Sequence, residues 1–167
     1  MAETPWLSEA AIGVAQGILN SHRMAFGSPL IAPLPADATP CQWAQALFAA
    51  ERVVMAHDGA DPGGDPGPRL IYANRAALRL WRRPWGELLG MPSRLTAEPA
   101  ARQERVQALQ QAREQQAIRG YSGIRIDSQG RRFQISGARV WTLWRPAGTE
   151  RLEPCGQAAA FSSWHWL

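Results

Sequence analysis

The spacing of apolar residues divides the chain into helical and extended segments. Apolar positions three or four residues apart predict helices over residues 6–22, through 43–48, over 76–81 and over 96–118. Alternating or β-branched runs predict strands at 52–57, 70–72, 121–126, 131–144 and 156–166. The long helix is expected to be capped by Thr96 and to carry a narrow apolar stripe through Val106 and Leu109.

The order of these segments predicts the fold class. Two strands come first, several helices follow, and three strands close the chain. A hairpin, a helical excursion and a three-stranded meander together form one antiparallel sheet of five strands, with helices packed on one face. We therefore expect an α+β fold in which the N-terminal helix is an additional element.

The segment LIYANRAALRLW changes from strand to helix at Asn74. Asn is a preferred N-cap residue because its side-chain oxygen accepts from a free amide of the first helical turn while its own backbone stays extended. We expect Asn74 to end the strand and to cap the helix through the amide of Ala76 or Ala77. Pro84 should end that helix.

The chain is expected to divide near residue 40. Residues 1–40 would form the N-terminal helix, capped by Ser8, and a proline-rich linker; residues 41–167 would form the core. The linker GSPLIAPLPADATP contains four prolines, which exclude a helix or a central strand. This linker is long enough to carry the first helix around the sheet.

An open sheet face predicts an interface. Leu7, Val14 and Ile18 lie near one face of the first helix, and Trp164 and Trp166 alternate along the last strand. Exposed tryptophans on a bare sheet face exceed what soluble monomers usually tolerate. We expect the helix to cover them, either on its own sheet or on that of a second chain, and we favour a homodimer.

Several motifs resemble those of one known family. YANRAALRLW, MPSRLTAE, YSGIRIDSQGRRFQI and GQAAAF occur in the order seen in the MEKHLA domain, a PAS-related family with stand-alone bacterial members. The resemblance runs from about Trp6 to Trp166. It implies a PAS-like fold and a sensing or interaction role, and it brings no established catalytic residues.

Two modes of action stay open for such a domain. As a sensory module, it encloses a small molecule between the 96–118 helix and the sheet or relays a signal through its own interface. Alternatively, it has a filled core and acts only through dimerisation or partner binding. A ligand is expected to be small and largely apolar, with one anionic or hydrogen-bonding group. The candidate pocket residues are Met55, His57, Tyr72, Leu78, Trp81, Met91, Arg94, Val106, Leu109 and Tyr121.

The sequence lacks the residues that two kinds of PAS-like sensor use to bind their cofactors. Flavin light sensors use a cysteine in an NCRFLQ-like helix, and nothing in this chain resembles it. Haem-binding members commonly ligate through a histidine on the long helix, and residues 96–118 contain none. A cysteinyl-flavin photocycle and that haem mode are disfavoured, whereas a non-covalent ligand stays open. Gln157 lies where flavin sensors place a ring-contacting glutamine, but pairing with the sheet is expected.

Composition and charge narrow the partners. The formal net charge is +4, and all 18 basic residues are arginine, a bias typical of a GC-rich bacterial genome. Arg75, Arg79, Arg82 and Arg83 cluster along one helix, but they accompany no DNA-binding motif, and a solvated face is expected rather than a nucleic-acid contact. No apolar run is long enough for a membrane span, and we expect a cytoplasmic protein.

The chain contains no recognisable catalytic constellation. GxGxxG, GxxxxGK, HExxH and GxSxG are absent. His57 beside Asp58 is the most tempting base, although a strand-end histidine bonded to a loop is the expected role. We predict no enzyme and no metal site. Neither Cys41 nor Cys155 belongs to a CxxC pair.

Three arginines on predicted strands raise a separate question. Arg125, Arg132 and Arg139 could each point into the fold or away from it. An inward guanidinium would need an acid or an anionic ligand, because an unpaired buried charge is costly. We expect all three to point outward.

Overall fold

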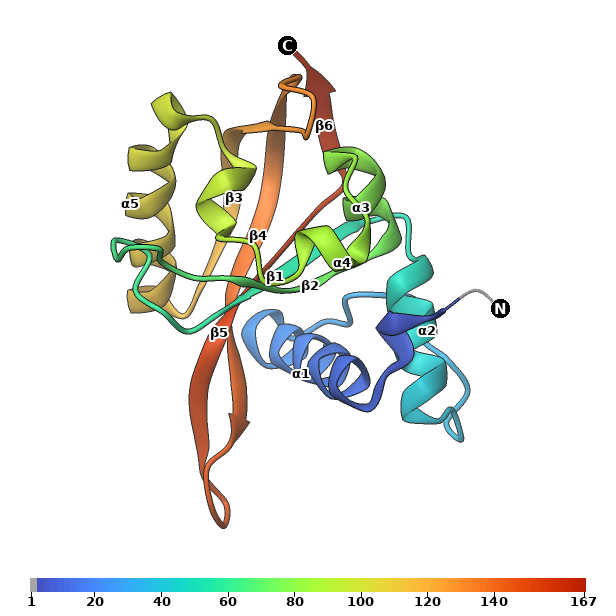
Figure 1. Cartoon of the computed structure of the whole chain (residues 1–167). Coiled ribbons are helices and arrows are strands. Elements are labelled where there is room, and N and C mark those ends of the chain that lie inside the picture. Colours follow the sequence, from blue (N-terminus) through green and yellow to red (C-terminus); the bar gives the residue numbers. More distant parts are fainter. Residues whose placement is uncertain (1–2) are drawn as a thin grey trace.

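The computed structural model describes residues 3–167 (Figure 1). The strands are β1 (Val53–Asp58), β2 (Leu70–Ala73), β3 (Ala117–Ile126), β4 (Arg132–Pro146), β5 (Leu152–Phe161) and β6 (Ser163–Trp166). The helices are η1 (Pro5–Leu7), α1 (Glu9–Phe26), α2 (Pro40–Ala49), α3 (Arg75–Trp81), α4 (Trp85–Leu88), η2 (Ser93–Thr96) and α5 (Pro99–Gln115).

All pairings within the sheet are antiparallel, in the order β2-β1-β5-β4-β3, and β6 pairs beside β4. The predicted α+β fold is confirmed. The last predicted strand is divided into β5 and β6 by a bend at Ser162, and Gly137 of β4, with φ +65°, lies where the partner of β4 changes. The β4–β5 hairpin projects beyond the helices (Figure 1).

The two faces of the sheet contact different helices. Side chains alternate along a strand, so Trp141 and Leu143 of β4 pack under α1, whereas Val140 faces the side of α3 and α5. Phe133 also faces that side, because the alternation shifts at Gly137, where β4 changes its pairing partner. In Figure 1, α1 and α5 lie apart across the sheet. The layer beneath α1 is an apolar core, and the layer beneath α5 contains the candidate site.

The N-terminal helix packs on its own sheet, but it does not cover the terminal tryptophans. Ile18 is fully buried, and His22 contacts Trp141 edge-on with ring centroids 5.0 Å apart. Trp164 and Trp166 pair across from Ile135 and Phe133, so they share the α3 face and stay partly exposed. The prediction that the stripe of Leu7, Val14 and Ile18 covers Trp164 and Trp166 is therefore wrong within this chain: Leu7 and Val14 pack against the core beneath α1.

Asn74 caps α3 as predicted, and it also joins α3 to two other elements. Its Oδ1 accepts from Ala77 N at 3.2 Å and from Val54 N at 3.0 Å. Its Nδ2 donates to Arg52 O at 2.7 Å and to Leu47 O at 3.3 Å. The side chain is fully buried. One amide thus connects β1, the end of α2 and the start of α3.

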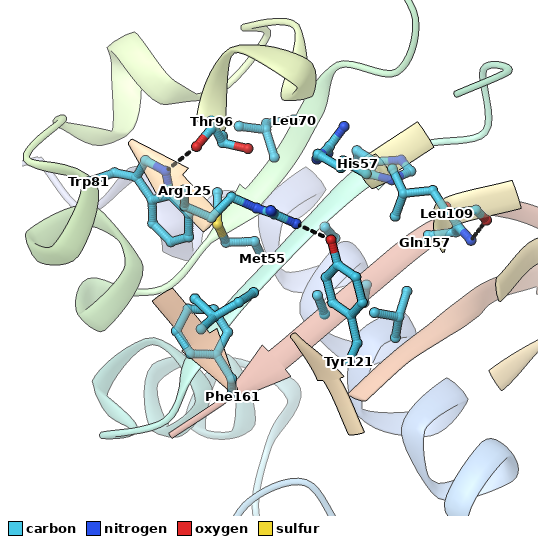
Figure 2. A pocket seen from close by; sticks show the side chains of 16 residues that line it. Met55, His57, Leu70, Trp81, Thr96, Leu109, Tyr121, Arg125, Gln157 and Phe161 are labelled. Atoms are coloured by element: carbon cyan, nitrogen blue, oxygen red, sulfur yellow. Dashed lines mark hydrogen bonds between the residues drawn. The ribbon is translucent and has the colours of Figure 1, made fainter. Parts of the chain in front are cut away.

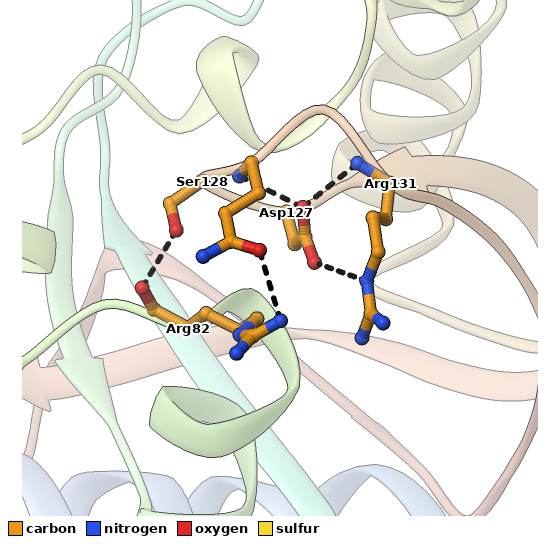
Figure 3. Close-up of polar contacts among 5 residues, drawn as sticks. Arg82, Asp127, Ser128 and Arg131 are labelled. Atoms are coloured by element: carbon orange, nitrogen blue, oxygen red, sulfur yellow. Dashed lines mark hydrogen bonds and ion pairs between the residues drawn. The ribbon is translucent and has the colours of Figure 1, made fainter.

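The end of α3 is fixed by the β3–β4 turn (Figure 3). Arg82 ends the helix in the left-handed region at φ 56°. Ser128 N donates to Trp81 O at 2.9 Å, and Ser128 Oγ donates to Arg82 O at 2.8 Å. Asp127 closes the turn by accepting from the backbone amides of Gln129 and Arg131. These bonds hold the Trp81 end of α3 against the sheet.

The helix predicted over residues 96–118, α5, begins later than predicted. Pro99 is its first residue and Glu98 the N-cap, without a side-chain cap bond. Proline favours the first helical position because its fixed φ suits the helix and its missing N–H would be unpaired there anyway. Thr96 instead belongs to η2, where its hydroxyl donates to Ser93 O at 2.7 Å.

We predict that Asn74→Ala lowers the free energy of unfolding by about 3 kcal/mol, more than the loss of a cap alone, because Val54 N and Arg52 O would remain buried without partners. Asn74→Gly should cost at least as much. Urea unfolding followed by tryptophan fluorescence measures both.

Asn20→Ala is the matched control, since Asn20 is exposed on α1. It should leave stability within about 0.5 kcal/mol of the wild type. A loss of only about 1 kcal/mol for Asn74→Ala, with Asn74→Gly milder, would show that the cap alone matters.

Candidate ligand-binding site

A cavity of about 60 Å³ lies between α5, η2 and the sheet face that carries β1, β3, β4 and β5 (Figure 2). Most of its wall is apolar, and a few polar side chains enter it. The lining residues are Met55, Ala56, His57, Leu70, Trp81, Thr96, Arg105, Leu109, Tyr121, Arg125, Ile135, Val140, Gln157, Ala158, Ala159 and Phe161.

The cavity brings together half of the predicted pocket residues. Met55, His57, Trp81, Leu109 and Tyr121 line it. They come from β1, α3, α5 and β3, so segments far apart in the sequence meet here. The predicted residues that do not line it are Tyr72, Leu78, Met91, Arg94 and Val106.

Tyr72 is on the wrong face of the sheet. It pairs with Ala56 in the β1–β2 ladder, so its side chain points to the α1 face and meets Trp85 edge-on at 5.7 Å between ring centroids. Its hydroxyl is buried and has no hydrogen-bond partner among residues 3–167, and burial raises its pKa. Tyr72 therefore cannot orient a ligand in this cavity.

The other four residues also lie outside the cavity. Arg94 donates to Asp65 Oδ1 at 3.0 Å and remains partly exposed. Leu78 and Met91 pack at the margin of the apolar cluster beneath α3. Val106 lies near Gly63 of the β1–β2 loop, because it sits on the outer flank of α5. The prediction that Val106 forms the apolar wall with Leu109 is wrong.

Two buried arginines enter the cavity. Arg105 of α5 and Arg125 of β3 are each 6% exposed. Arg105 Nη2 donates to Ser93 Oγ at 3.0 Å, and Arg125 Nη2 donates to Tyr121 Oη at 2.8 Å. Figure 2 shows the Arg125 guanidinium pointing across the cavity to Tyr121. The prediction that Arg125 points outward is wrong.

The other two strand arginines have partners within the protein. Arg132 forms an ion pair with Glu98 at 2.9 Å. Arg139 Nη1 lies 3.0 Å from His22 Nε2, and its guanidinium lies over the ring of Phe26. Arg139 is therefore involved in the packing of α1 on the sheet, and only Arg125 among the three enters the cavity.

Two neutral polar side chains face each other on adjacent strands. His57 and Gln157 are paired in the β1–β5 ladder. His57 Nδ1 lies 2.8 Å from Asp58 O, and Gln157 Nε2 donates to Leu109 O at 3.0 Å. His57 Nε2 and Gln157 Oε1 are buried and have no partner in the described chain. Since a carbonyl only accepts, Nδ1 carries the proton and Nε2 is an acceptor.

The electrostatic environment disfavours positive charge. Burial, with a smaller contribution from the charge of Arg105, lowers the pKa of His57 to about 4, although the hydrogen bond to Asp58 O acts in the opposite direction. Burial, followed by the charge of Arg125, lowers the pKa of Arg105 to about 9. His57 is therefore neutral at pH 7, while Arg105 stays charged.

A second hollow adjoins the cavity. It has a volume of about 290 Å³ and is bordered by Arg113, Gln116 and Trp144, among others. His57 and Gln157 line both spaces. These two side chains therefore lie where the cavity and the hollow adjoin.

Comparison with protein families identifies the chain. The model of the MEKHLA domain matches residues 12–166. The chain belongs to the MEKHLA family. The match spans β1 to β6 and most of α1. The residues that line the cavity and most of α1 therefore lie within the MEKHLA domain. No curated protein matches the chain in sequence.

Solved structures with similar folds are PAS and light-oxygen-voltage domains. The PAS domain of a Colwellia psychrerythraea protein has a TM-score of 0.55 and 13% identity, with 71% of this chain and 92% of that chain covered. A fungal light-oxygen-voltage photoreceptor domain has a TM-score of 0.56 and 18% identity, with 96% and 95% covered.

An RNA-binding light-oxygen-voltage receptor has a TM-score of 0.58 and 19% identity; the match covers 80% of the MEKHLA chain and 35% of that receptor. At these identities the likeness concerns the fold. The MEKHLA domain of this chain thus has a PAS-like fold.

Sequence reasoning missed Arg105 as a cavity residue. Arg105, Leu109 and Ala112 follow the helical spacing of one buried stripe on α5. A charged residue within an apolar stripe was the signal that could have located it.

No helix in the described part of the chain is long and apolar enough to cross a membrane.

The low pKa of His57 predicts a pH dependence. In the unfolded chain its pKa is about 6.5, so a histidine held neutral in the fold contributes stability that is full above pH 6.5 and is lost as the pH falls toward 4. When the pH is lowered from 7 to 5, the free energy of unfolding should fall by about 2 kcal/mol less in His57→Gln than in the wild type. Urea unfolding at the two pH values measures this difference.

His165→Gln is the matched control because His165 is exposed on β6. It should show the wild-type pH dependence. Parallel pH profiles for the wild type and His57→Gln would mean that His57 is not held neutral by the fold.

Proposed function

We propose that this MEKHLA domain is a sensory module that binds a small molecule, apolar in part and bearing an anionic or hydrogen-bonding group, in the cavity between α5 and the sheet. The observation that carries the proposal is the pair of buried acceptors, His57 Nε2 and Gln157 Oε1, which have no partner in the described chain. Buried polar atoms are nearly always hydrogen-bonded, so two such atoms beside one apolar cavity favour a guest molecule.

The volume limits the ligand. An apolar cavity of about 150 Å³ accommodates benzene, and this one measures about 60 Å³. A ligand of a few non-hydrogen atoms suits that space. A three-ring flavin does not, so we do not propose a flavin cofactor here.

The ligand would act on a link between the sheet and the long helix. Gln157 on β5 is bonded through Nε2 to Leu109 O on α5. A molecule bound to Gln157 Oε1 therefore contacts a side chain that already joins the two layers. Occupancy could in this way change how firmly α5 is held, and the domain would transmit it as a change in helix packing.

We propose binding and not catalysis. His57 is bonded to the backbone carbonyl of Asp58, while Asp58 Oδ1 accepts from Ala60 N at 3.1 Å. A catalytic imidazole is usually oriented by a second side chain, often a carboxylate. The carboxylate of Asp58 is bonded to Ala60 N and does not orient His57. The bonds of His57 and Asp58 are therefore better explained as those that end β1 than as a catalytic pair.

Filling the cavity should abolish binding. Leu109→Trp places a larger ring against Val140 and should exclude any ligand while the protein stays folded. Mass analysis of small molecules released from the denatured protein, with circular dichroism as the check on folding, should show loss of a retained molecule in the variant.

Leu152→Trp provides the same substitution at an exposed site on the β4–β5 hairpin. It should retain the ligand as the wild type does. Marked unfolding of Leu109→Trp would instead indicate that α5 packs on a solid core.

A second candidate function is association through β6. All four of its residues are exposed, and within residues 3–167 it pairs with β4 alone. Trp164, Trp166 and Leu167 form an exposed apolar group at this edge. An antiparallel edge can pair with its own copy by a two-fold axis, so we propose a homodimer through β6 rather than through α1.

The arginine cluster on α3 gives less support for a nucleic-acid partner. Arg75 donates to Ala49 O at 3.4 Å, Arg82 donates to Gln129 Oε1 at 3.0 Å, and Arg83 pairs with Glu87. Three of the four guanidinium groups thus have protein partners. We propose no nucleic-acid role.

If the β6 edge mediates association, Trp164→Ser combined with Trp166→Ser should convert a dimer to a monomer, because the apolar edge would be lost. Light scattering coupled to gel filtration over a range of concentrations measures the mass. Leu152→Ser, on the projecting hairpin, should remain dimeric. A wild type that stays monomeric at every concentration would contradict the dimer.

A further inference from the structure

Two positive charges are buried in the cavity without an opposite charge. Within residues 3–167, no carboxylate lies within ion-pair distance of Arg105 or Arg125. Their protein partners are the hydroxyls of Ser93 and Tyr121 and the carbonyl of Ile124, all neutral. Buried charges in proteins are paired or bind a ligand of opposite charge, and here the protein supplies no such pair.

The fold positions these charges. Gly123 lies between Tyr121 and Arg125 on β3 and pairs across from Ile135. A Cβ at this position would lie 2.8 Å from Tyr121 Oη and 2.9 Å from Arg125 Nη1. The absent side chain therefore allows Tyr121 to hold the Arg125 guanidinium over the cavity.

The cavity also offers acceptors of a defined kind. Because Nδ1 of His57 donates to Asp58 O, Nε2 presents a lone pair. Because Nε2 of Gln157 donates to Leu109 O, Oε1 remains as an acceptor. The polar groups of the cavity are thus two cationic donors and two neutral acceptors, within walls such as Met55 and Val140.

We propose that the ligand is a short hydroxycarboxylate, whose carboxylate binds Arg105 and Arg125 and whose hydroxyl donates to His57 Nε2 or Gln157 Oε1. The carboxylate neutralises the buried charge, and arginine is well suited to bind it because its planar group offers paired donors. The hydroxyl supplies the donor that both acceptors lack. The assignment rests on the proposed function and names its ligand class.

The test is a titration of the ¹⁵N-labelled chain, residues 1–167, at constant ionic strength. The probes are glycolate, lactate, propionate, lactamide and sodium chloride. The indole N–H of Trp81, which lines the cavity and is identified with a Trp81→Phe variant, reports binding. Lactate or glycolate should bind about tenfold more tightly than propionate, which lacks the hydroxyl. Lactamide, which lacks the charge, and chloride should cause no saturable shift.

Variants separate charge from position. Arg105→Met and Arg125→Met should each weaken lactate binding at least about tenfold and raise the thermal midpoint of the ligand-free protein, since each removes an unpaired buried charge. Gly123→Ala keeps every charge but displaces the Tyr121–Arg125 contact, and it should also weaken binding. Arg79→Met removes an exposed charge from α3 and should change neither property.

The outcomes distinguish this assignment from the proposed function. If lactamide binds as well as lactate, or Arg105→Met retains lactate binding, the anionic ligand is wrong while a cavity ligand stands. If propionate equals lactate, the hydroxyl is wrong. Saturable shifts with chloride alone would indicate an adventitious ion only. If no probe binds and the wild type releases no molecule that Leu109→Trp lacks, both the assignment and the proposed function fail.

Discussion

The arrangement of this domain depends on one buried amide. Asn74 ends β2, begins α3, and bonds to the backbone of β1 and of α2. The bonds are made in the interior, where an unpaired backbone group is costly. They set the angle at which α3 leaves the sheet. Trp81 at the far end of that helix is then held by the β3–β4 turn, which places its ring over the cavity.

The two faces of the sheet divide structure from function. The α1 face is filled by Trp141, Ile18 and their neighbours and has the character of an ordinary core. The α5 face contains a cavity into which two guanidinium groups, an imidazole and an amide project. A fold that buries two unpaired charges sacrifices stability at that point. Functional sites commonly carry such a cost, because the same charges bind a ligand when it arrives.

Much of the fold could be predicted from the sequence, because it follows from local chemistry. The Asn74 cap, the two strands on either side of the DPGGDPG loop and the closing meander each follow from residue type and period. The start of the long helix could not be predicted as easily, since Thr96 and Pro99 both favour a helix start and the proline determined it. The break between β5 and β6 depends on tertiary pairing with β4, which no local pattern encodes.

The site was harder to predict because it depends on the face of the sheet to which each side chain points. Tyr72 and His57 both lie on neighbouring strands, yet the pairing register places them on opposite faces. Arg125 was expected to point outward, since an inward arginine needs an anionic partner, and it points inward all the same. That apparent violation of a general preference is the strongest indication of what the cavity binds.

The most direct test of this account is a crystal structure of residues 1–167 grown with lactate. The account predicts density for a small molecule beside His57, with two oxygens within hydrogen-bond distance of the guanidinium groups of Arg105 and Arg125. An empty or collapsed cavity, with the two guanidinium groups turned to carboxylates of the protein itself, would contradict it.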